Sequence, residues 1–294
     1  MAGQEWLAER FEENRSRLRA VAYRMLGSLG EAEDAVQEAW LRLSRSDAGN
    51  IENLSGWLTT VVARVCLDVL RSRKSRGEEP LGRQPQEPTG KKGAGSDPEQ
   101  EAMLADSAGL AVLVVLDRLA PAERVAFVLH DLFGLSFEEI ATIVERSPAA
   151  TRQLASRARR RMQGVAKPPS ASLSQQREVI DAFLTALRAG DVEGLLAVLD
   201  PDLIVRVDGA AARAGVPQEV RGAQNWAKGA VAFARFIRPA TVCIVDGTVG
   251  AVWAPGGYLQ RALKCMIANG KITQVEIIAD AARLAQLEIA VLGF

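Results

Sequence analysis

The stretch from Ser136 to Gln163 constrains the fold of this chain more than any other, because its residues encode two short helices joined by a tight turn. Ser136 and Glu139 have the spacing of a capping box, which opens a helix by pairing side chains with its free backbone N–H groups. Ser147 and Pro148 favour a second start, because serine is a good N-cap and proline costs no hydrogen bond at the first helical position. The pattern predicts a helix-turn-helix.

The second of these helices is strongly basic on one side. Its inward positions, which recur at helical spacing, are Thr151, Leu154, Ala158 and Met162. The outward positions carry hydrogen-bond donors that match guanine edges and phosphates when a helix lies in a major groove. We expect DNA contacts from Arg152, Gln153, Ser156, Arg157, Arg159 and Arg160. A basic face that is merely solvated is the alternative, and the capped two-helix context favours DNA binding over it.

The length and charge of the chain indicate several folded parts. With 294 residues and 48% hydrophobic content, the chain has enough apolar surface for two or three domains. Its formal net charge is zero, but residues 149–167 hold six basic residues and no acid, whereas residues 31–38 hold four acids and no base. Local charge is therefore more informative here than the total.

The cysteines and the hydropathy pattern exclude several classes of protein. Three cysteines that lie far apart favour neither a disulfide framework nor a zinc site, so we expect no metal and no cofactor. The sequence shows no apolar signal core and no run long enough to span a membrane. We expect a cytoplasmic protein with no membrane partner.

Two breaks divide the chain into domains. Residues 77–98 contain five glycines and four prolines without periodicity, and Pro168 and Pro169 mark a second break after the basic helix. The expected domains are therefore residues 7–76, 101–163 and 176–294, and the expected linkers are residues 77–100 and 164–175.

The sequence of the first of these domains predicts a set of helices. One helix has its apolar stripe at Phe11, Leu18, Ala22 and Met25 and ends near Gly27. The next has an acidic start and a buried side formed by Val36, Trp40 and Leu43. Its exposed side carries Asp34, Gln37, Glu38 and Leu41. A mixed acidic and apolar face suits a protein partner, and a solvated face is the alternative.

A third helix begins near Ser55 and ends in the basic run LRSRKSR. Positive charge beside exposed polar groups is expected where a helix meets a nucleic-acid backbone. The candidate nucleic-acid contacts on this helix are Trp57, Arg64, Asp68, Arg71, Arg73 and Lys74. A core position is the other interpretation of Trp57, as it is of Trp40, because tryptophan at helical spacing is more often buried.

These segments together resemble a known family. EAEDAVQEAWLRL, GWLTTVVARVCLDVLRSRKSR, a tether and the helix-turn-helix occur over residues 7–163 in the order found in extracytoplasmic-function (ECF) RNA polymerase sigma factors. The resemblance implies that residues 7–76 are sigma region 2 and residues 101–163 are region 4. The implied partners are core RNA polymerase and promoter DNA, both double-stranded and melted.

The resemblance also implies roles for particular residues. Asp34, Gln37 and Glu38 would dock on the clamp helices of the polymerase, and the helix Trp57–Arg76 would recognise and open the minus-10 element. The helix-turn-helix would read the minus-35 element. Residues 44–56 correspond to the loop that captures a flipped promoter base, with Asn50 and Asn53 as candidates only.

The last part of the chain has a different pattern. A long helix and a short one precede an alternating strand, and further strands are expected at residues 240–245, 250–253, 259–267 and 273–278, separated by turn residues. This predicts an α+β domain with a curved sheet. It resembles the cone-shaped SnoaL-like domains that a sigma-J-like group of ECF sigma factors carries after region 4. In place of that group's glycine-rich segment, the chain has DGAAAR at residues 208–213. The expected fold class is therefore two all-α domains followed by an α+β domain.

The chemistry of this last domain points away from catalysis. Asp202 or Asp208 could serve as a general base, but Tyr258 is the domain's sole tyrosine and the only histidine, His130, lies in the helix-turn-helix domain as a partly buried helix residue. We expect no enzyme. Our hypothesis is that the domain regulates the sigma factor in cis by contacting regions 2 and 4 or their tether. The alternatives are a stand-alone helix-turn-helix regulator with a ligand-sensing domain, and a DNA-tethered enzyme. The existence of a separate anti-sigma factor is left open.

Overall fold

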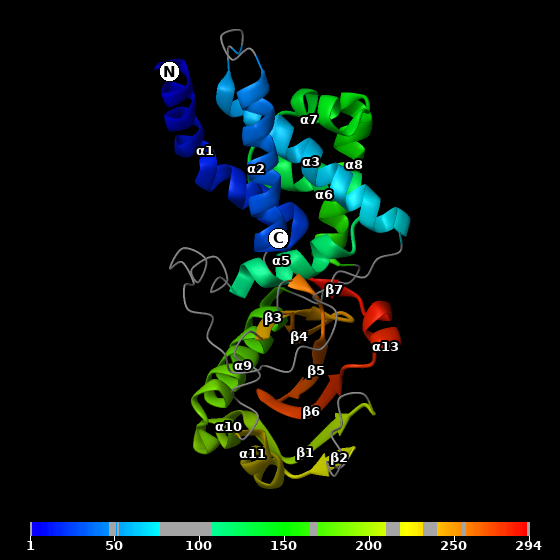
Figure 1. The fold of residues 1–294 in the computed structure, drawn as a ribbon. Helices are drawn as coiled ribbons and strands as arrows, with labels where there is room; N and C mark the ends of the chain where they lie inside the picture. Colours follow the sequence, from blue (N-terminus) through cyan, green and yellow to red (C-terminus); the bar gives the residue numbers. More distant parts are fainter. Residues whose placement is uncertain are drawn as a thin grey trace. The chain divides into compact units, whose positions relative to one another are not determined.

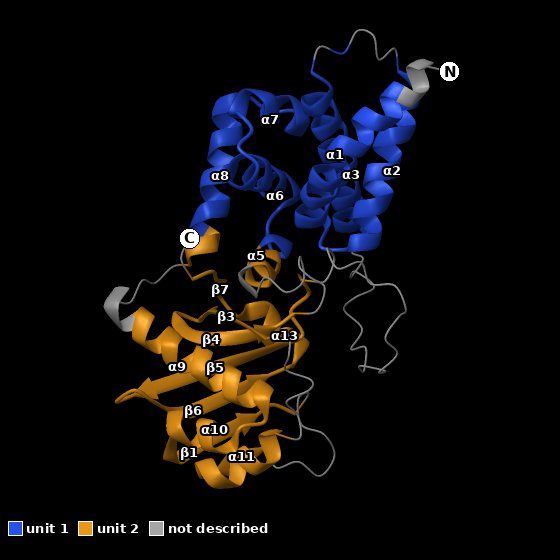
Figure 2. Cartoon of the chain, turned by 90° about the vertical axis from the view of Figure 1, so that its left-hand side faces the viewer, with its two compact units in different colours: residues 1–80, 116–160 blue, residues 81–115, 161–294 orange. Residues whose placement is uncertain are grey.

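The computed structural model describes residues 2–46, 51, 53–76, 107–164, 170–209, 218–231, 240–254 and 257–292. It divides into two compact units, formed by residues 1–80 with 116–160 and by residues 81–115 with 161–294 (Figure 2). In the described ranges, every helix is too short or too polar to cross a membrane.

Three long helices make up the first part of the first unit (Figure 1). They are α1 (Ala2–Leu26), α2 (Leu29–Arg45) and α3 (Leu54–Arg76), and all three pack on one another. Gly27 ends α1 with a φ of 77°, a conformation that glycine adopts without strain, and Ser28 caps α2. The predicted stripe of α1 is confirmed, since Phe11, Leu18, Ala22 and Met25 are buried.

The predicted helix-turn-helix is present in the same unit. It consists of α7 (Phe137–Val144) and α8 (Pro148–Gln163), and it follows α6 (Pro121–Phe127) and the short π-helix η3 (Val128–Leu132). Ser136 and Glu139 form the expected capping box. Ser147 caps α8, because its Oγ accepts a hydrogen bond from the Ala150 N–H at 3.2 Å. Both helix starts therefore lie where the sequence predicts them.

The second unit is an α+β domain with α5 (Ser107–Asp117) contributing residues up to Val115. Its sheet has seven strands in the order β2-β1-β6-β5-β4-β3-β7. The strands are β1 (Leu199–Val207), β2 (Glu219–Arg221), β3 (Ala240–Val245), β4 (Thr248–Trp253), β5 (Arg261–Ala268), β6 (Lys271–Ile278) and β7 (Ile289–Ala290). The neighbours in this order are antiparallel except β1 and β6, which are parallel.

Helices cover one face of this sheet and close its core (Figure 1). They are α9 (Ser170–Ala189), α10 (Val192–Val198) and α11 (Ala223–Val231), while α13 (Ala281–Gln286) lies just before β7. Phe183 and Leu187 of α9, Leu195 of α10 and Ala227 of α11 are buried in one cluster with strand residues. The predicted fold class is confirmed: helical regions precede an α+β domain with a curved sheet.

Two details differ from the sequence prediction. Helix α9 begins at Ser170, inside the expected linker 164–175, and β2 and β7 were not predicted. The expected linker 77–100 lies outside the described residues, as does most of the segment 208–213.

Candidate nucleic-acid interface

Helix α8 separates an exposed polar face from a buried one. The predicted inward residues Thr151, Ala158 and Met162 are fully buried, as is Ala155, and Leu154 is half-buried. The exposed residues are Arg152, Gln153, Ser156, Arg157 and Arg160. Five of the six predicted contacts therefore point to solvent from one helix, where they are accessible to DNA.

Arg152 is positioned by an aromatic side chain at the start of the motif. Its guanidinium carbon lies 5.1 Å from the centre of the Phe137 ring, which is within cation–π range. His130 stacks on the same ring, with centroids 3.9 Å apart, and its Nδ1 lies 2.8 Å from the Leu135 carbonyl oxygen. His130 is thus a half-buried helix residue, as expected from the sequence, and its stacking on Phe137 is an additional finding of the structure.

Arg159 differs from the other five residues of the predicted α8 set. Its side chain is only 38% exposed, and its Nε lies 2.5 Å from Oδ1 of Asp131. This ion pair joins α8 to η3. In this geometry Arg159 orients the recognition helix, and a direct DNA contact by Arg159 stays a prediction. Helical spacing alone missed this, because Asp131 is 28 positions away.

The candidate residues of α3 also separate into two groups. Arg64, Asp68, Arg71 and Lys74 are exposed, and Trp57 is half-buried. The Arg73 side chain, by contrast, is 14% exposed, forms an ion pair with Glu31, and donates to the Leu26 carbonyl oxygen at 3.3 Å. Arg73 therefore ties α3 to the first two helices.

Part of the exposed α3 face contacts the helix-turn-helix within the first unit. Nη2 of Arg64 donates to the Thr142 carbonyl oxygen at 3.2 Å. Nη2 of Arg71 lies 4.0 Å from Oε2 of Glu145, the residue that ends α7 in the left-handed conformation with a φ of 58°. These two arginines thus join α3 to α7 and its carboxyl end within the first unit.

The candidate protein-docking residues lie together on α2. Asp34, Gln37 and Leu41 are exposed, whereas Glu38 is half-buried and accepts a hydrogen bond from Nε of Arg42 at 2.8 Å. Leu41 is 39% exposed, so that this face of α2 combines an apolar side chain with polar ones.

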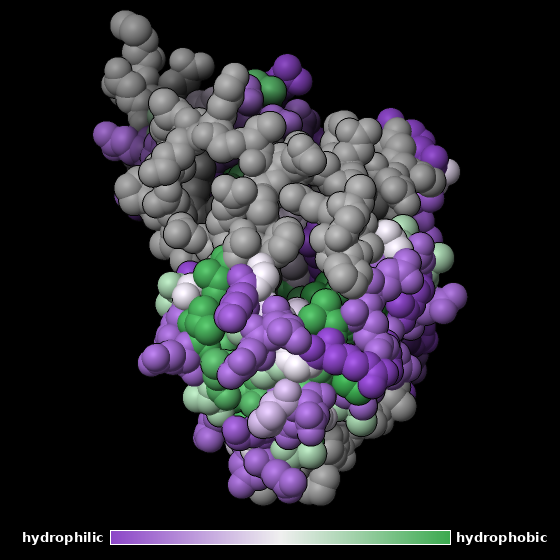
Figure 3. Space-filling model, turned by 90° about the horizontal axis from the view of Figure 1, so that it is seen from below, coloured by the Kyte–Doolittle hydropathy of each residue, from purple (hydrophilic) through white to green (hydrophobic). Residues whose placement is uncertain are grey.

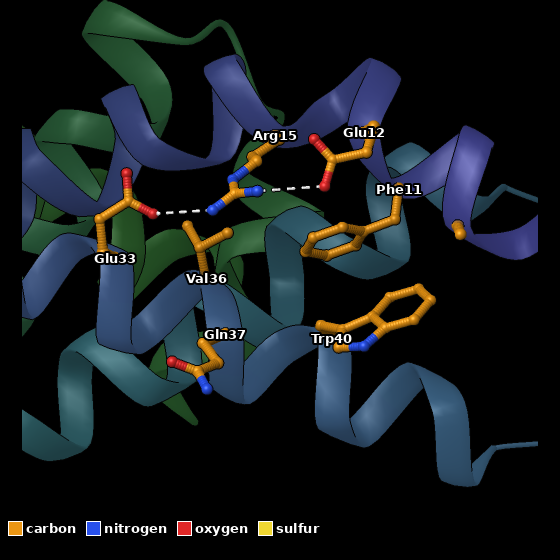
Figure 4. Close-up of a pocket in the computed structure, with 8 residues that line it drawn as sticks. Phe11, Glu12, Arg15, Glu33, Val36, Gln37 and Trp40 are labelled. Atoms are coloured by element: carbon orange, nitrogen blue, oxygen red, sulfur yellow. Dashed lines mark hydrogen bonds and ion pairs between the residues drawn. The ribbon is translucent and has the colours of Figure 1, made fainter. Parts of the chain in front are cut away.

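A cavity of about 450 Å³ opens beside this face, between α1 and α2 (Figure 4). Phe11 and Trp40 pack against each other there, with ring centroids 5.1 Å apart, and Gln37 lies at the same cavity. Arg15 bridges two acids, because its guanidinium lies 3.1 Å from Glu12 and 3.4 Å from Glu33. Gln37 is thus shared by the cavity and the candidate docking face.

Asn50 and Asn53 are the two candidates for binding a flipped promoter base, and the structure describes only one of them. Asn50 lies outside the described residues. Asn53 caps α3: its Oδ1 accepts the Gly56 N–H at 2.9 Å, and its carbonyl oxygen accepts the Trp57 N–H at 3.0 Å. The side chain of Asn53 therefore already has a structural partner.

Neither aspartate considered as a general base has the environment of one. Oδ2 of Asp208 accepts the backbone N–H groups of Ala279 at 2.8 Å and Asp280 at 2.9 Å, and Arg283 lies 3.8 Å from it. Three partners of this kind hold the carboxylate in a fixed position. Asp202 is exposed.

On the face of this domain visible in Figure 3, hydrophilic side chains surround smaller apolar areas.

Comparisons with known proteins agree with this arrangement. The Sigma-70 region 2 family model matches residues 10–76, and the Sigma-70 region 4 family model matches residues 109–162. The chain is 38% identical over 280 residues to the probable ECF RNA polymerase sigma factor SigI of Mycobacterium tuberculosis, covering 93% of each chain. It is 36% identical over 285 residues to the ECF RNA polymerase sigma factor SigJ of the same species, covering 92% of this chain and 90% of that one.

The crystal structure of SigJ is also similar, with 30% identity, a TM-score of 0.45 and coverage of 95% of this chain and 98% of the other. Both sigma families match in the order expected from the sequence, and the two relatives match over nearly their whole length. The chain therefore belongs to the extracytoplasmic-function RNA polymerase sigma factors.

Proposed function

We propose that this chain binds core RNA polymerase in the cytoplasm and directs promoter-specific initiation of transcription. The observation that carries the proposal is that the first unit exposes two separate sets of basic and polar side chains, one on α3 and one on α8. A protein that reads two promoter elements needs two such sets.

In this proposal each surface has one task. The α8 residues Arg152, Gln153, Ser156 and Arg157 contact bases of the minus-35 element, and Arg160 contacts the backbone beside them. On α3, Trp57, Arg64, Asp68, Arg71 and Lys74 contact the minus-10 element as it opens. Asp34, Gln37, Glu38 and Leu41 of α2 dock on the polymerase.

A stand-alone helix-turn-helix regulator is the alternative, and it explains less of the chain. Such a protein needs the α8 face but neither the basic face of α3 nor the mixed acidic and apolar face of α2. It would also be expected to dimerise in order to read two half-sites. Residues 10–76 would then have no role.

The α+β domain acts in this proposal as a regulator in cis and not as a catalyst. Its candidate base Asp208 is held by two backbone N–H groups, which supports a structural role. Covalent attachment immediately after α8 supports an influence on DNA reading. Deletion of residues 170–294 should therefore change polymerase binding or promoter-dependent transcription, and unchanged values for both would refute this regulatory role.

Transcription with purified core polymerase tests the main proposal. Promoters are first selected from random DNA by core polymerase together with this protein, and initiation is then measured with and without the protein. Initiation that requires the protein supports the proposal. Failure both to bind core polymerase and to add any initiation would instead favour the stand-alone regulator.

A further inference from the structure

The carboxyl end of the recognition helix belongs to the second unit, where the segment Ile289–Leu292 contacts it. We call this segment the β7 segment. The Val291 N–H donates a hydrogen bond to the Met162 carbonyl oxygen at 2.8 Å. The last four carbonyl groups of a helix have no partner within the helix, and Met162 lies in that last turn. The β7 segment therefore caps α8 from another part of the chain.

Close packing accompanies this hydrogen bond. Gly164 ends α8 with a φ of 71°, and a Cβ atom added there would lie 2.8 Å from the Cβ atom of Ala290. Met162 has no exposed surface, Ala290 is 2% exposed and Val291 is 6% exposed. Only a glycine at position 164 lets the two backbones approach this closely.

The β7 segment is held by the sheet at the same time. Ala290 and Ile289 pair with Ile244 and Val245 of β3. Just before them, the Glu288 N–H donates to Oδ1 of Asp246 at 2.9 Å, and the Glu288 carbonyl oxygen accepts the Asp246 N–H at 2.8 Å. One segment thus joins the sheet of the α+β domain to the end of α8.

A second contact joins the same domain to region 4. Helix α5 is buried around its whole circumference from Gly109 to Leu116, although a surface helix has only one apolar face. Gly257, after β4, lies so close to α5 that an added Cβ atom would be 2.9 Å from the Cβ atom of Leu113. Figures 1 and 2 show α5 beside β7. Residues of α5 and the end of α8 both fall within the region matched by the Sigma-70 region 4 family.

Capping and DNA reading use different parts of α8. Val291 caps the last turn of α8 at Met162, whereas Arg152, Gln153, Ser156 and Arg157 lie on one side of its earlier turns. Capping and DNA binding are therefore compatible, because they use the end and one side of the same helix.

We propose that the α+β domain is a structural extension of region 4, in which the β7 segment caps the recognition helix and stays docked while α8 reads promoter DNA. This rests on the proposed sigma function of the chain. Regulation by the domain then works by positioning region 4, and not by releasing the β7 segment from it.

Replacing glycine residues tests the contact between Gly164 and Ala290 separately from other effects. Gly164→Ala introduces a methyl group that collides with Ala290, and Gly164→Ala combined with Ala290→Gly removes the collision again. Gly270→Ala is the matched control, because Gly270 has a φ of 74° and nothing within 4 Å of an added Cβ atom. The variants at 164 and 270 thus share the backbone strain and differ in the contact.

Hydrogen exchange of peptides covering residues 287–292 is the first measurement. We expect Gly164→Ala to speed exchange there by about five- to thirtyfold, the change that a loss of about 1–2 kcal/mol makes in a docking equilibrium. The double variant should return towards wild type, and Gly270→Ala should not differ from it. In wild type, the protection should persist when core polymerase and promoter DNA are bound. Loss of protection in that complex would overturn the proposal.

Transcription from a promoter with an intact or a scrambled minus-35 element is the second measurement. We expect Gly164→Ala to lose most of the stimulation that depends on the minus-35 element and to keep binding to core polymerase, with rescue in the double variant. Full stimulation by a Gly164→Ala protein whose β7 segment exchanges rapidly would also overturn the proposal. Absence of stimulation by the wild-type chain is a different result, because it contradicts the sigma function itself.

Discussion

At the scale of single residues, Glu139 shows how a helix start in the DNA-reading motif depends on charge. Its carboxylate accepts hydrogen bonds from the Ser136 hydroxyl at 2.7 Å and from the Ser136 N–H at 2.8 Å. Both hydrogen bonds lower the pKa of Glu139 below its usual value, and the one from the Ser136 hydroxyl has the larger effect. The ionised form is thus the one that the folded state prefers.

This pKa shift gives the capping box a pH dependence. A carboxyl whose pKa is lower in the folded state contributes stability above its unfolded pKa, and the contribution is lost as the pH falls through the folded pKa. We expect Ser136→Ala to lower the free energy of unfolding by about 1 kcal/mol near neutral pH and by less near pH 3. Urea unfolding at the two pH values measures this. Glu139→Gln keeps a capping box without the titration, and an equal loss for Ser136→Ala at both pH values would refute the prediction.

Arg152 and Arg157 are the residues of α8 on which sequence reading most depends in our proposal. Replacing either with alanine should cost about 1 to 3 kcal/mol of discrimination between the correct minus-35 element and one with a changed base. Competition binding of holoenzyme to the two DNAs measures it. Equal weakening on both DNAs would make these residues phosphate contacts. Arg159→Ala is the comparison, since its ion pair with Asp131 predicts a loss of stability first.

At the scale of secondary-structure elements, the sheet depends on one close approach between neighbouring strands. Gly250 of β4 lies opposite Lys264 of β5, and an added Cβ atom at Gly250 would be 2.2 Å from the Leu263 carbonyl oxygen. Backbone atoms cannot yield as the end of a flexible side chain can. The two strands could not then keep their present separation.

We therefore expect Gly250→Ala to destabilise the α+β domain by about 3 kcal/mol or more. Gly229→Ala is the matched control in the same domain, because Gly229 lies in α11, is exposed and has open space around it. Alanine there should stabilise the domain by about 0.5–1 kcal/mol. Thermal unfolding of both variants tests the pair, and a small effect of Gly250→Ala would show that β4 and β5 can move apart.

The elements also show what the sequence could and could not predict. Strands β3 to β6 were predicted close to their observed bounds, because Asp246-Gly247 and Asn269-Gly270 are hairpin turns whose residues all have positive φ. The parallel pairing of β1 with β6 was not, since it joins Val205 to Val275 without a local signal. The two-residue β7 was too short to show alternation.

The same reasoning applies to the candidate site. Helical periodicity found the exposed face of α8, because the spacing of buried and exposed positions is a property of the helix itself. It could not show that Arg159 pairs with Asp131 or that Arg73 pairs with Glu31, since those partners come from other helices. It also could not show that Arg64 contacts Thr142 in the free protein.

At the scale of the whole molecule, the chain has two cores with buried thiols: Cys66 in the first unit, and Cys243 and Cys265 in the second. Cys66 lies in the first unit and Cys265 in the second, and burial raises the pKa of each to about 12. At pH 8 almost none of either thiol is ionised, and each is shielded by its core. Each cysteine therefore reports on the unit that surrounds it.

We expect Cys66 and Cys265 to resist a thiol reagent at pH 8 in the native chain. In a urea titration, Cys66 should become reactive as the first unit opens and Cys265 as the second unit opens. Mass spectrometry of the labelled peptides locates the modification and gives the two midpoints. Rapid labelling of Cys66 or Cys265 without urea would contradict the burial seen here, and full labelling in concentrated urea is the control.

The hydrogen bond from Val291 to Met162 also sets an order of events during synthesis of the protein. Ribosomes add about 5–20 residues per second, so Val291 is made on the order of ten seconds after Met162. During that time the helix-turn-helix can leave the ribosome and fold with its own caps at Ser136 and Ser147. The hydrogen bond at the end of α8 cannot form until Val291 has been made. The cap on Met162 is thus the last of these three caps that can form, because its donor, Val291, is made last.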